Sequence, residues 1–177
     1  MKLIAIAAIL FSTPVLAQTL GEETGMNGML DRPPTGTDLL IDIHMFDLFE
    51  QGADEIAQQR GDDGLREFSS SHAEAAARQD KQLAALGDKA GVAVKFSEDP
   101  DITASGRLSG LQGAVGAAFV RQYYEAQASE YDAAVSALRR YLQNPDQDDI
   151  KAFAAKQLPS FEAGQTSALA SWNRARK

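Results

Sequence analysis

The stretch that decides the fold is residues 107–143, which read RLSGLQGAVGAAFVRQYYEAQASEYDAAVSALRRYLQ. Apolar and small residues recur in it at steps of three and four, which is the spacing of one face of an α-helix. Two such faces are present, one through Leu108 and Val115 and the other through Val120 and Leu138. A helix with so wide an apolar arc contacts more than one neighbour. The stretch therefore predicts a long helix inside a helical bundle.

Three further stretches show the same helical period, and no stretch alternates with the period of two that a strand requires. Thr37 is the expected N-cap of the first helix, and Gly91 is suited to end the second. Pro159 lies inside the fourth helix, where it removes one backbone hydrogen bond. Residues 92–106 form a long connection between the second and third helices. The sequence thus predicts an all-α four-helix bundle with helices over residues 37–60, 65–89, 107–143 and 147–174.

The N-terminus has the pattern of a signal peptide. Lys2 precedes an apolar run over residues 3–11, and small residues lead to Ala17, after which we expect cleavage. The run is shorter than the roughly 20 residues of a bilayer span, which opposes the alternative of a membrane anchor. We therefore expect a periplasmic protein without stable membrane insertion. The expected divisions are a signal peptide at 1–17, a flexible leader at 18–36 and a bundle domain at 37–175.

Composition narrows the classes of function. The formal net charge is −8, which gives no support to nucleic-acid binding or to adhesion to anionic lipid. The chain has no cysteine, so no disulfide can hold the fold. Its length is sufficient for a single core to bury most of its apolar surface.

Two segments carry a resemblance to a known family. Residues 119–123 have the pattern Phe-x-x-x-Tyr, and residues 154–159 have the pattern Ala-x-x-x-Leu-Pro. They resemble segments of the bacterial envelope proteins known as domain of unknown function 4142, often labelled "predicted outer membrane protein". The resemblance covers roughly residues 39–170. It implies an exported, ferritin-like four-helix bundle with no established activity.

The resemblance also implies positions for functional side chains. Members of that family commonly carry a histidine on each of the second, third and fourth helices. An ungapped placement puts Ala76, Tyr131 and Gly164 at those positions, so all three histidines are absent. The family's first-helix glutamate falls at Glu50, or at Glu55 if the register slips.

The chemistry-bearing residues argue against a metal site of the ferritin type. Such a di-metal site requires Glu-x-x-His on two helices, and the chain contains no such motif. We therefore predict no metal site, no cofactor, no catalytic residue and no enzyme activity. His72 and Glu50 are the only weak candidates for a cation site, since they lie at similar depth on neighbouring helices. The alternatives are a core histidine with one hydrogen bond and a glutamate at the edge of the buried face; His44 is expected at the surface.

Three functions from different classes stay open. The first is a non-enzymatic protein that binds an unidentified envelope partner. The second is a weak metal- or small-ligand-binding protein that uses His72, Glu50 and further acids such as Glu130 or Glu162. The third is a homodimer formed through the third helix. The tyrosines are expected to fill the core, with hydroxyls at its rim: Tyr123, Tyr124, Tyr131 and Tyr141.

Overall fold

Five α-helices and no strand make up the part of the chain that the structure, a computed structural model, describes, which is residues 33–177. The all-α prediction is therefore confirmed for this part. The expected signal peptide at 1–17, and the leader up to residue 32, lie outside the described residues. The helices are α2 (Gly36–Arg60), α3 (Asp63–Ala90), α4 (Ile102–Gly113), α5 (Gly116–Gln143) and α6 (Asp148–Ala175).

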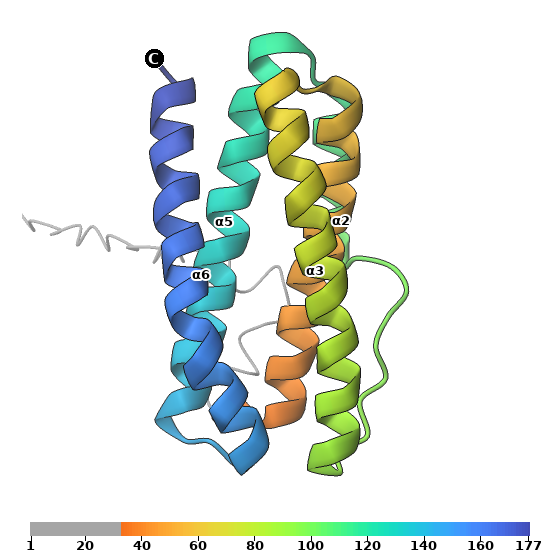
Figure 1. The fold of residues 1–177 in the computed structure, drawn as a ribbon, viewed down its shortest axis with the longest axis vertical. Coiled ribbons are helices and arrows are strands. Elements are labelled where there is room, and N and C mark those ends of the chain that lie inside the picture. The colour runs from red at the N-terminus through yellow and green to blue at the C-terminus, as the bar shows by residue number, and fades with distance from the viewer. Residues whose placement is uncertain (1–32) are drawn as a thin grey trace, which may run out of the picture. The chain divides into compact units, whose positions relative to one another are not determined.

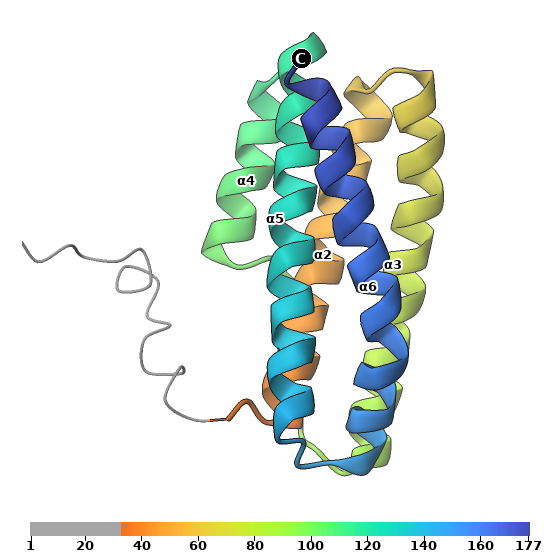
Figure 2. The same ribbon diagram turned by 90° about the vertical axis from the view of Figure 1, so that its left-hand side faces the viewer.

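The four long helices lie alongside one another (Figure 1). Short turns join α2 to α3 and α5 to α6, so each of these pairs is antiparallel. By contrast, α3 and α5 run in the same direction, because α4 returns the chain to the end at which α3 begins (Figure 2). Among the neighbouring pairs of long helices, α3 and α6 contact each other much less than the rest. This sparse contact leaves room for clefts between them.

Local sequence explains where α2 and α3 begin and end. The N-cap of α2 is Thr35, whose hydroxyl accepts from the backbone of Asp38 at 3.2 Å while the Asp38 carboxylate accepts from the backbone of Thr35 at 2.8 Å. This capping box satisfies two free N–H groups, so the prediction of Thr37 as the cap is wrong by two residues. Asp62 caps α3, and Gly91 ends it with a φ of 68°, as predicted.

The predicted third helix is two helices. The chain turns at Ala114 and Val115, between α4 and α5, and Gly116 takes a φ of 57° that favours glycine. The connection is correspondingly shorter, since α4 already begins at Ile102. The two apolar faces of this stretch thus belong partly to different helices. Leu108 of α4 packs close to Gly52 of α2.

Hydrophobic side chains form two separate buried clusters along the length of the molecule. We call them the first core and the second core. The first core contains Leu39, Leu40, Ile43, Phe46, Leu83, Ala134, Val135, Leu138, Tyr141, Ile150, Ala154 and Phe161. The second core contains Phe49, Ala53, Ile56, Ala57, Leu65, Ala104, Leu111, Ala114, Phe119, Tyr123 and Ala126. None of the described helices is long and apolar enough to cross a membrane.

Candidate metal centre

Three acids of α2 lie inside the molecule, where the first core gives way to the second. Asp47, Glu50 and Asp54 are spaced by three and four residues, so they share one face of the helix. The exposed fraction of each is 0%. Acids are almost never fully buried unless they are paired. The expectation that Glu50 lies at the edge of the buried face is therefore wrong.

His72 of α3 meets two of these acids. Its Nδ1 atom lies 3.0 Å from Oδ2 of Asp54 and 3.1 Å from Oε2 of Glu50. Glu50, Asp54 and His72 each offer one ligand atom, and these three atoms lie within 4.8 Å of one another. One imidazole nitrogen with two carboxylate oxygens is a donor set that binds transition metals. The structure thus brings both predicted candidates together and adds Asp54, which sequence reasoning missed.

Helix α5 supplies one partner for each of the three groups. The partners are four residues apart, so they project from one face of α5. Hydrogen bonds of this kind fix the orientation of a metal ligand. The Tyr123 hydroxyl donates to Oδ1 of Asp54 at 2.5 Å, the Gln127 amide donates to Oε2 of Glu50 at 2.7 Å, and the Tyr131 hydroxyl lies 2.8 Å from Nε2 of His72.

The charges of the cluster are strongly coupled. Burial lowers the pKa of His72, but the hydrogen bonds to Asp54 and Glu50 outweigh it and raise the pKa to about 12. Burial also raises the pKa of Glu50, against the opposing effect of His72. At neutral pH the His72 ring of the metal-free protein therefore carries a proton on both nitrogens, and a metal ion that binds Nδ1 must displace the proton there. Its Nδ1–H points at the two carboxylates, and its Nε2–H donates to the Tyr131 oxygen.

Asp47 stands beside the cluster without joining it. The Gln79 amide donates to its Oδ1 atom at 3.0 Å. Burial, with the nearby charges of Asp80 and Glu50, raises the pKa of Asp47 to about 9, so this carboxyl is neutral at pH 7. Within residues 33–177, Oδ2 of Asp47 and Oε1 of Glu50 are the buried side-chain polar atoms that have no hydrogen-bond partner.

Two clefts reach the cluster from the gap between α3 and α6. The acid cleft has a volume of about 160 Å³ and is lined by Asp47, Glu50 and Ser160 among others. The serine cleft has a volume of about 250 Å³, and Gly164, Ser167 and Ser171 contribute to its α6 wall. His72 and Tyr131 are the two residues that line both clefts. The His72–Tyr131 pair is therefore the wall between them.

The three positions at which the family resemblance implied histidines all border these clefts. Ala76 lines the acid cleft, Gly164 lines the serine cleft, and Tyr131 lines both. The Tyr131 ring lies so close to Gly164 that a Cβ atom at position 164 would clash with it. Tyr131 is thus a hydrogen-bonding member of the cluster, as well as a filler of the interior.

Other predicted residues do not belong to the cluster. His44 is not at the surface, because only 4% of it is exposed and its Nδ1 atom lies 2.5 Å from Oδ1 of Asp80. The two further acids considered for a cation site form ion pairs elsewhere: Glu130 with Arg107, and Glu162 with Arg139.

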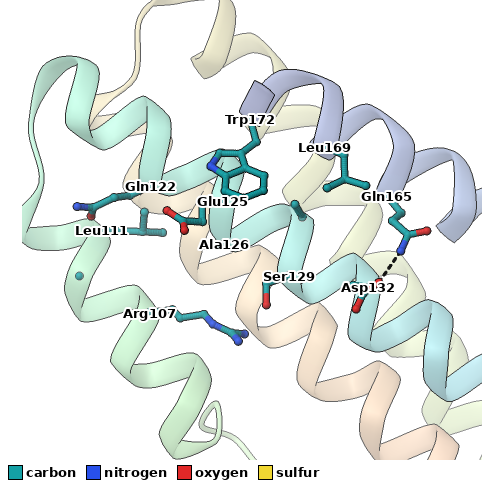
Figure 3. A pocket seen from close by; sticks show the side chains of 12 residues that line it. Arg107, Leu111, Gln122, Glu125, Ala126, Ser129, Asp132, Gln165, Leu169 and Trp172 are labelled. Atoms are coloured by element: carbon teal, nitrogen blue, oxygen red, sulfur yellow. Dashed lines mark hydrogen bonds between the residues drawn. The ribbon is translucent and has the colours of Figure 1, made fainter. Parts of the chain in front are cut away.

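A larger cleft than the acid cleft and the serine cleft lies on the surface between α4, α5 and α6 (Figure 3). It has a volume of about 580 Å³, and Leu111, Ala126, Leu169 and Trp172 contribute to its mainly apolar wall. It shares no lining residue with the acid cleft or the serine cleft. A hydrogen bond from Gln165 to Asp132 crosses part of its rim.

Comparison with known proteins places the chain in a family. Residues 23–170 match the family described as Domain of unknown function (DUF4142). No curated protein and no solved structure matches the chain significantly. The match spans most of the 177 residues and includes all of α2, α3, α4 and α5 and most of α6. The chain therefore belongs to the DUF4142 family.

Proposed function

We propose that the protein is a non-enzymatic, exported envelope protein with a ferritin-like four-helix arrangement, and that it binds one divalent metal ion through Glu50, Asp54 and His72. The N-terminal sequence pattern supports export, and the four long helices support the ferritin-like arrangement. The observation that carries the metal site is the convergence of three ligand atoms that α5 already orients. An oriented outer shell is typical of metal sites.

The types of ligand atom indicate which metal ions this site would prefer. Calcium and magnesium prefer oxygen ligands, and magnesium keeps several waters. A set of one nitrogen and two carboxylates suits zinc, iron or manganese better. Three protein ligands also leave a position free, as at zinc sites that hold an exchangeable water or small ligand.

A bound cation would also give a partner to a buried oxygen atom of the cluster that has no hydrogen bond. Oε1 of Glu50 is fully buried and has no partner among the described residues. A buried acceptor without a hydrogen bond costs about 1–3 kcal/mol. The unpartnered oxygen belongs to a would-be ligand and lies beside the acid cleft, which Glu50 lines. Oε1 of Glu50 is therefore available to coordinate an ion at this site.

Calorimetric titration of the purified, chelator-stripped protein with zinc and then manganese tests this proposal. We expect one ion per chain and a higher melting temperature, since a ligand at 100 times its Kd stabilises a fold by about 2.7 kcal/mol. Glu50→Gln and Asp54→Asn should each lower the affinity at least about tenfold, because each removes a charged ligand. The matched control is Glu55→Gln, which removes an exposed acid next to Asp54.

Two results would contradict the metal proposal. One is the absence of stoichiometric binding for zinc, manganese and iron(II). The other is an equal loss of affinity in the Glu55→Gln control, which would assign binding to surface acids. Turnover of a substrate that depends on Glu50 or His72 would contradict the non-enzymatic role, and leave the metal site standing.

A further inference from the structure

We propose that the cleft between α4, α5 and α6, which we call the surface cleft, binds a linear aliphatic diamine or polyamine whose terminal ammonium groups contact Glu125 and Asp132 (Figure 3). Its volume of about 580 Å³ lies within the range of ligand-binding clefts. The surface cleft shares no lining residue with the acid cleft or the serine cleft. Binding there therefore does not depend on the proposed metal ion.

The unpaired charge of the surface cleft is negative. Glu125 and Asp132 line it from α5, both are exposed, and neither forms an ion pair within residues 33–177. Arg107 also lines the cleft, but its guanidinium is already paired with Glu130. The formal net charge of −8 further attracts cations to the protein. The ligand that complements this cleft is therefore positively charged.

The spacing of the two acids indicates a ligand with two charges. Asp132 follows Glu125 by two turns on one face of α5, which is about 10.5 Å along the helix axis. The Gln165 amide of α6 donates to Asp132 at 2.8 Å. Because α6 runs antiparallel to α5, Trp172 lies two turns away from Asp132, at the level of Glu125. One ammonium group cannot contact both carboxylates, whereas a chain with an ammonium group at each end can.

The rest of the wall is suited to the methylene groups of such a chain. Leu111 of α4, Ala126 of α5 and Leu169 of α6 contribute to it, and Leu169 is 40% exposed. Covering such apolar surface with methylene groups stabilises a complex. Gly110 adds space on the α4 side, since a Cβ atom there would meet no atom within 4 Å. An aliphatic chain therefore fits between the two acids better than a compact polar ion does.

Trp172 provides an aromatic ring at the Glu125 end of the surface cleft. The faces of an indole ring attract cations. The guanidinium of Arg176 lies 4.6 Å from the centre of the Trp172 ring, so this ring already contacts one cation. Arg176 does not line the surface cleft, whereas Trp172 does. Trp172 is also the single tryptophan of the chain, so its fluorescence reports directly on the cleft.

Fluorescence titration of the metal-free protein at low ionic strength compares two compounds of equal chain length. Octamethylenediamine has an ammonium group at each end, and in aminooctanol a hydroxyl replaces one of them. We expect the diamine to bind roughly 2- to 5-fold more tightly, the equivalent of one exposed ion pair. Glu125→Gln and Asp132→Asn should each remove this preference, because each leaves a single carboxylate. The matched control is Glu67→Gln, which removes an exposed acid of α3 and should keep the preference.

A second pair of variants tests whether both compounds occupy the surface cleft. Gly110→Leu places a side chain in the cleft and should abolish saturable binding of both compounds. Gly106→Leu is the matched control on the same helix. A Cβ atom at position 106 also meets no atom within 4 Å, but Gly106 does not line the cleft, so both affinities should equal those of the wild type.

The possible outcomes are distinguishable. A preference for the diamine that both acid variants lose and Glu67→Gln keeps supports the proposal. Equal affinities of the two compounds for the wild type, or a preference that the acid variants retain, overturn it. A fluorescence change that never saturates, or that saturates equally in Gly110→Leu, overturns it as well. The metal site stands or fails separately, because its ligands lie elsewhere. Circular dichroism verifies folding, and the two acid variants decide the question if Gly110→Leu does not fold.

Discussion

The two histidines of the chain are both largely buried, and the difference between their surroundings distinguishes a structural role from a site. His44 of α2 meets one carboxylate, Asp80, at 2.5 Å and the backbone carbonyl of Ser97 at 2.7 Å. Its ring also contacts Phe96, with centroids 4.7 Å apart. It therefore fastens the connection between α3 and α4 onto α2. Asp80 is 33% exposed, so water shares the solvation of its charge.

His72 differs because its ring contacts two buried carboxyl groups, where His44 contacts one that is partly exposed. Both of its carboxylate partners, Glu50 and Asp54, are fully buried, and one oxygen of Glu50 has no hydrogen-bond partner within residues 33–177. A cleft also reaches this histidine. Burial by itself therefore does not mark a functional histidine. The proposed site at His72 rests instead on its two buried carboxyl partners and on the cleft beside them.

Matched leucine substitutions provide the sharpest test of this comparison. His72→Leu leaves two buried carboxyl groups without the charged ring that both of them contact, so we expect a loss of about 3–5 kcal/mol in the free energy of unfolding. Urea unfolding of the metal-free protein at pH 7 measures it. An unchanged or higher stability would mean that the acids are not charged in the fold, and the comparison would break.

His44→Leu should cost less, about 1–2 kcal/mol, because Asp80 can turn to water when its partner is lost. The damage should also be local. Hydrogen exchange measured by mass spectrometry should show lower protection in residues 92–101, with α5 and α6 unaffected. A loss as large as that of His72→Leu would show that the two histidines are equivalent.

The last test concerns Asp47, whose pKa both Asp80 and Glu50 help to raise. Its pKa is about 9 in the fold against 3.8 in a free side chain. Between these values the unfolded chain binds fewer protons than the folded chain, so stability falls as pH rises. Asp47→Asn removes this dependence, so we expect a gain in the free energy of unfolding at pH 8 with little change near pH 4.

Urea unfolding at several pH values checks the prediction for Asp47. The exposed Asp88→Asn substitution on α3 is the control and should leave the slope with pH as it is in the wild type. A lower stability of Asp47→Asn at pH 8 would mean that Asp47 is ionised in the fold. The acids of α2 would then carry more charge than His72 can balance.

Much of the fold could be predicted from sequence because apolar periodicity is a local property. The all-α class and the approximate positions of three long helices follow from it. The break at residues 114–115 was missed because apolar residues at helical spacing continue across it, although Gly113 and Gly116 flank the turn. A small misplacement arose at Thr35, where Asp38 completes a capping box that Thr37 lacks.

The candidate site was less accessible to sequence reasoning. The absence of a Glu-x-x-His motif argues against a di-metal site. It does not argue against a site for a single ion whose two acids, Glu50 and Asp54, come from one helix. The spacing of Asp47, Glu50 and Asp54 within the apolar face of α2 was the available signal. The contribution of Tyr123, Gln127 and Tyr131 depends on α5 lying in register with α2 and α3. That register follows from tertiary packing, which a local sequence pattern does not record.

The polar layer between the first core and the second core has a consequence for how the helices are aligned. Leucine-rich and alanine-rich faces can slide past one another with little change in contact energy. A slide of α5 by one turn, about 5.4 Å, would exchange the partners in these pairs, because Tyr123, Gln127 and Tyr131 are four residues apart; a tyrosine would then face Glu50 in place of Gln127. The three pairs that bridge α5 to α2 and α3 therefore favour the observed alignment of these helices, in which each polar group has its own partner.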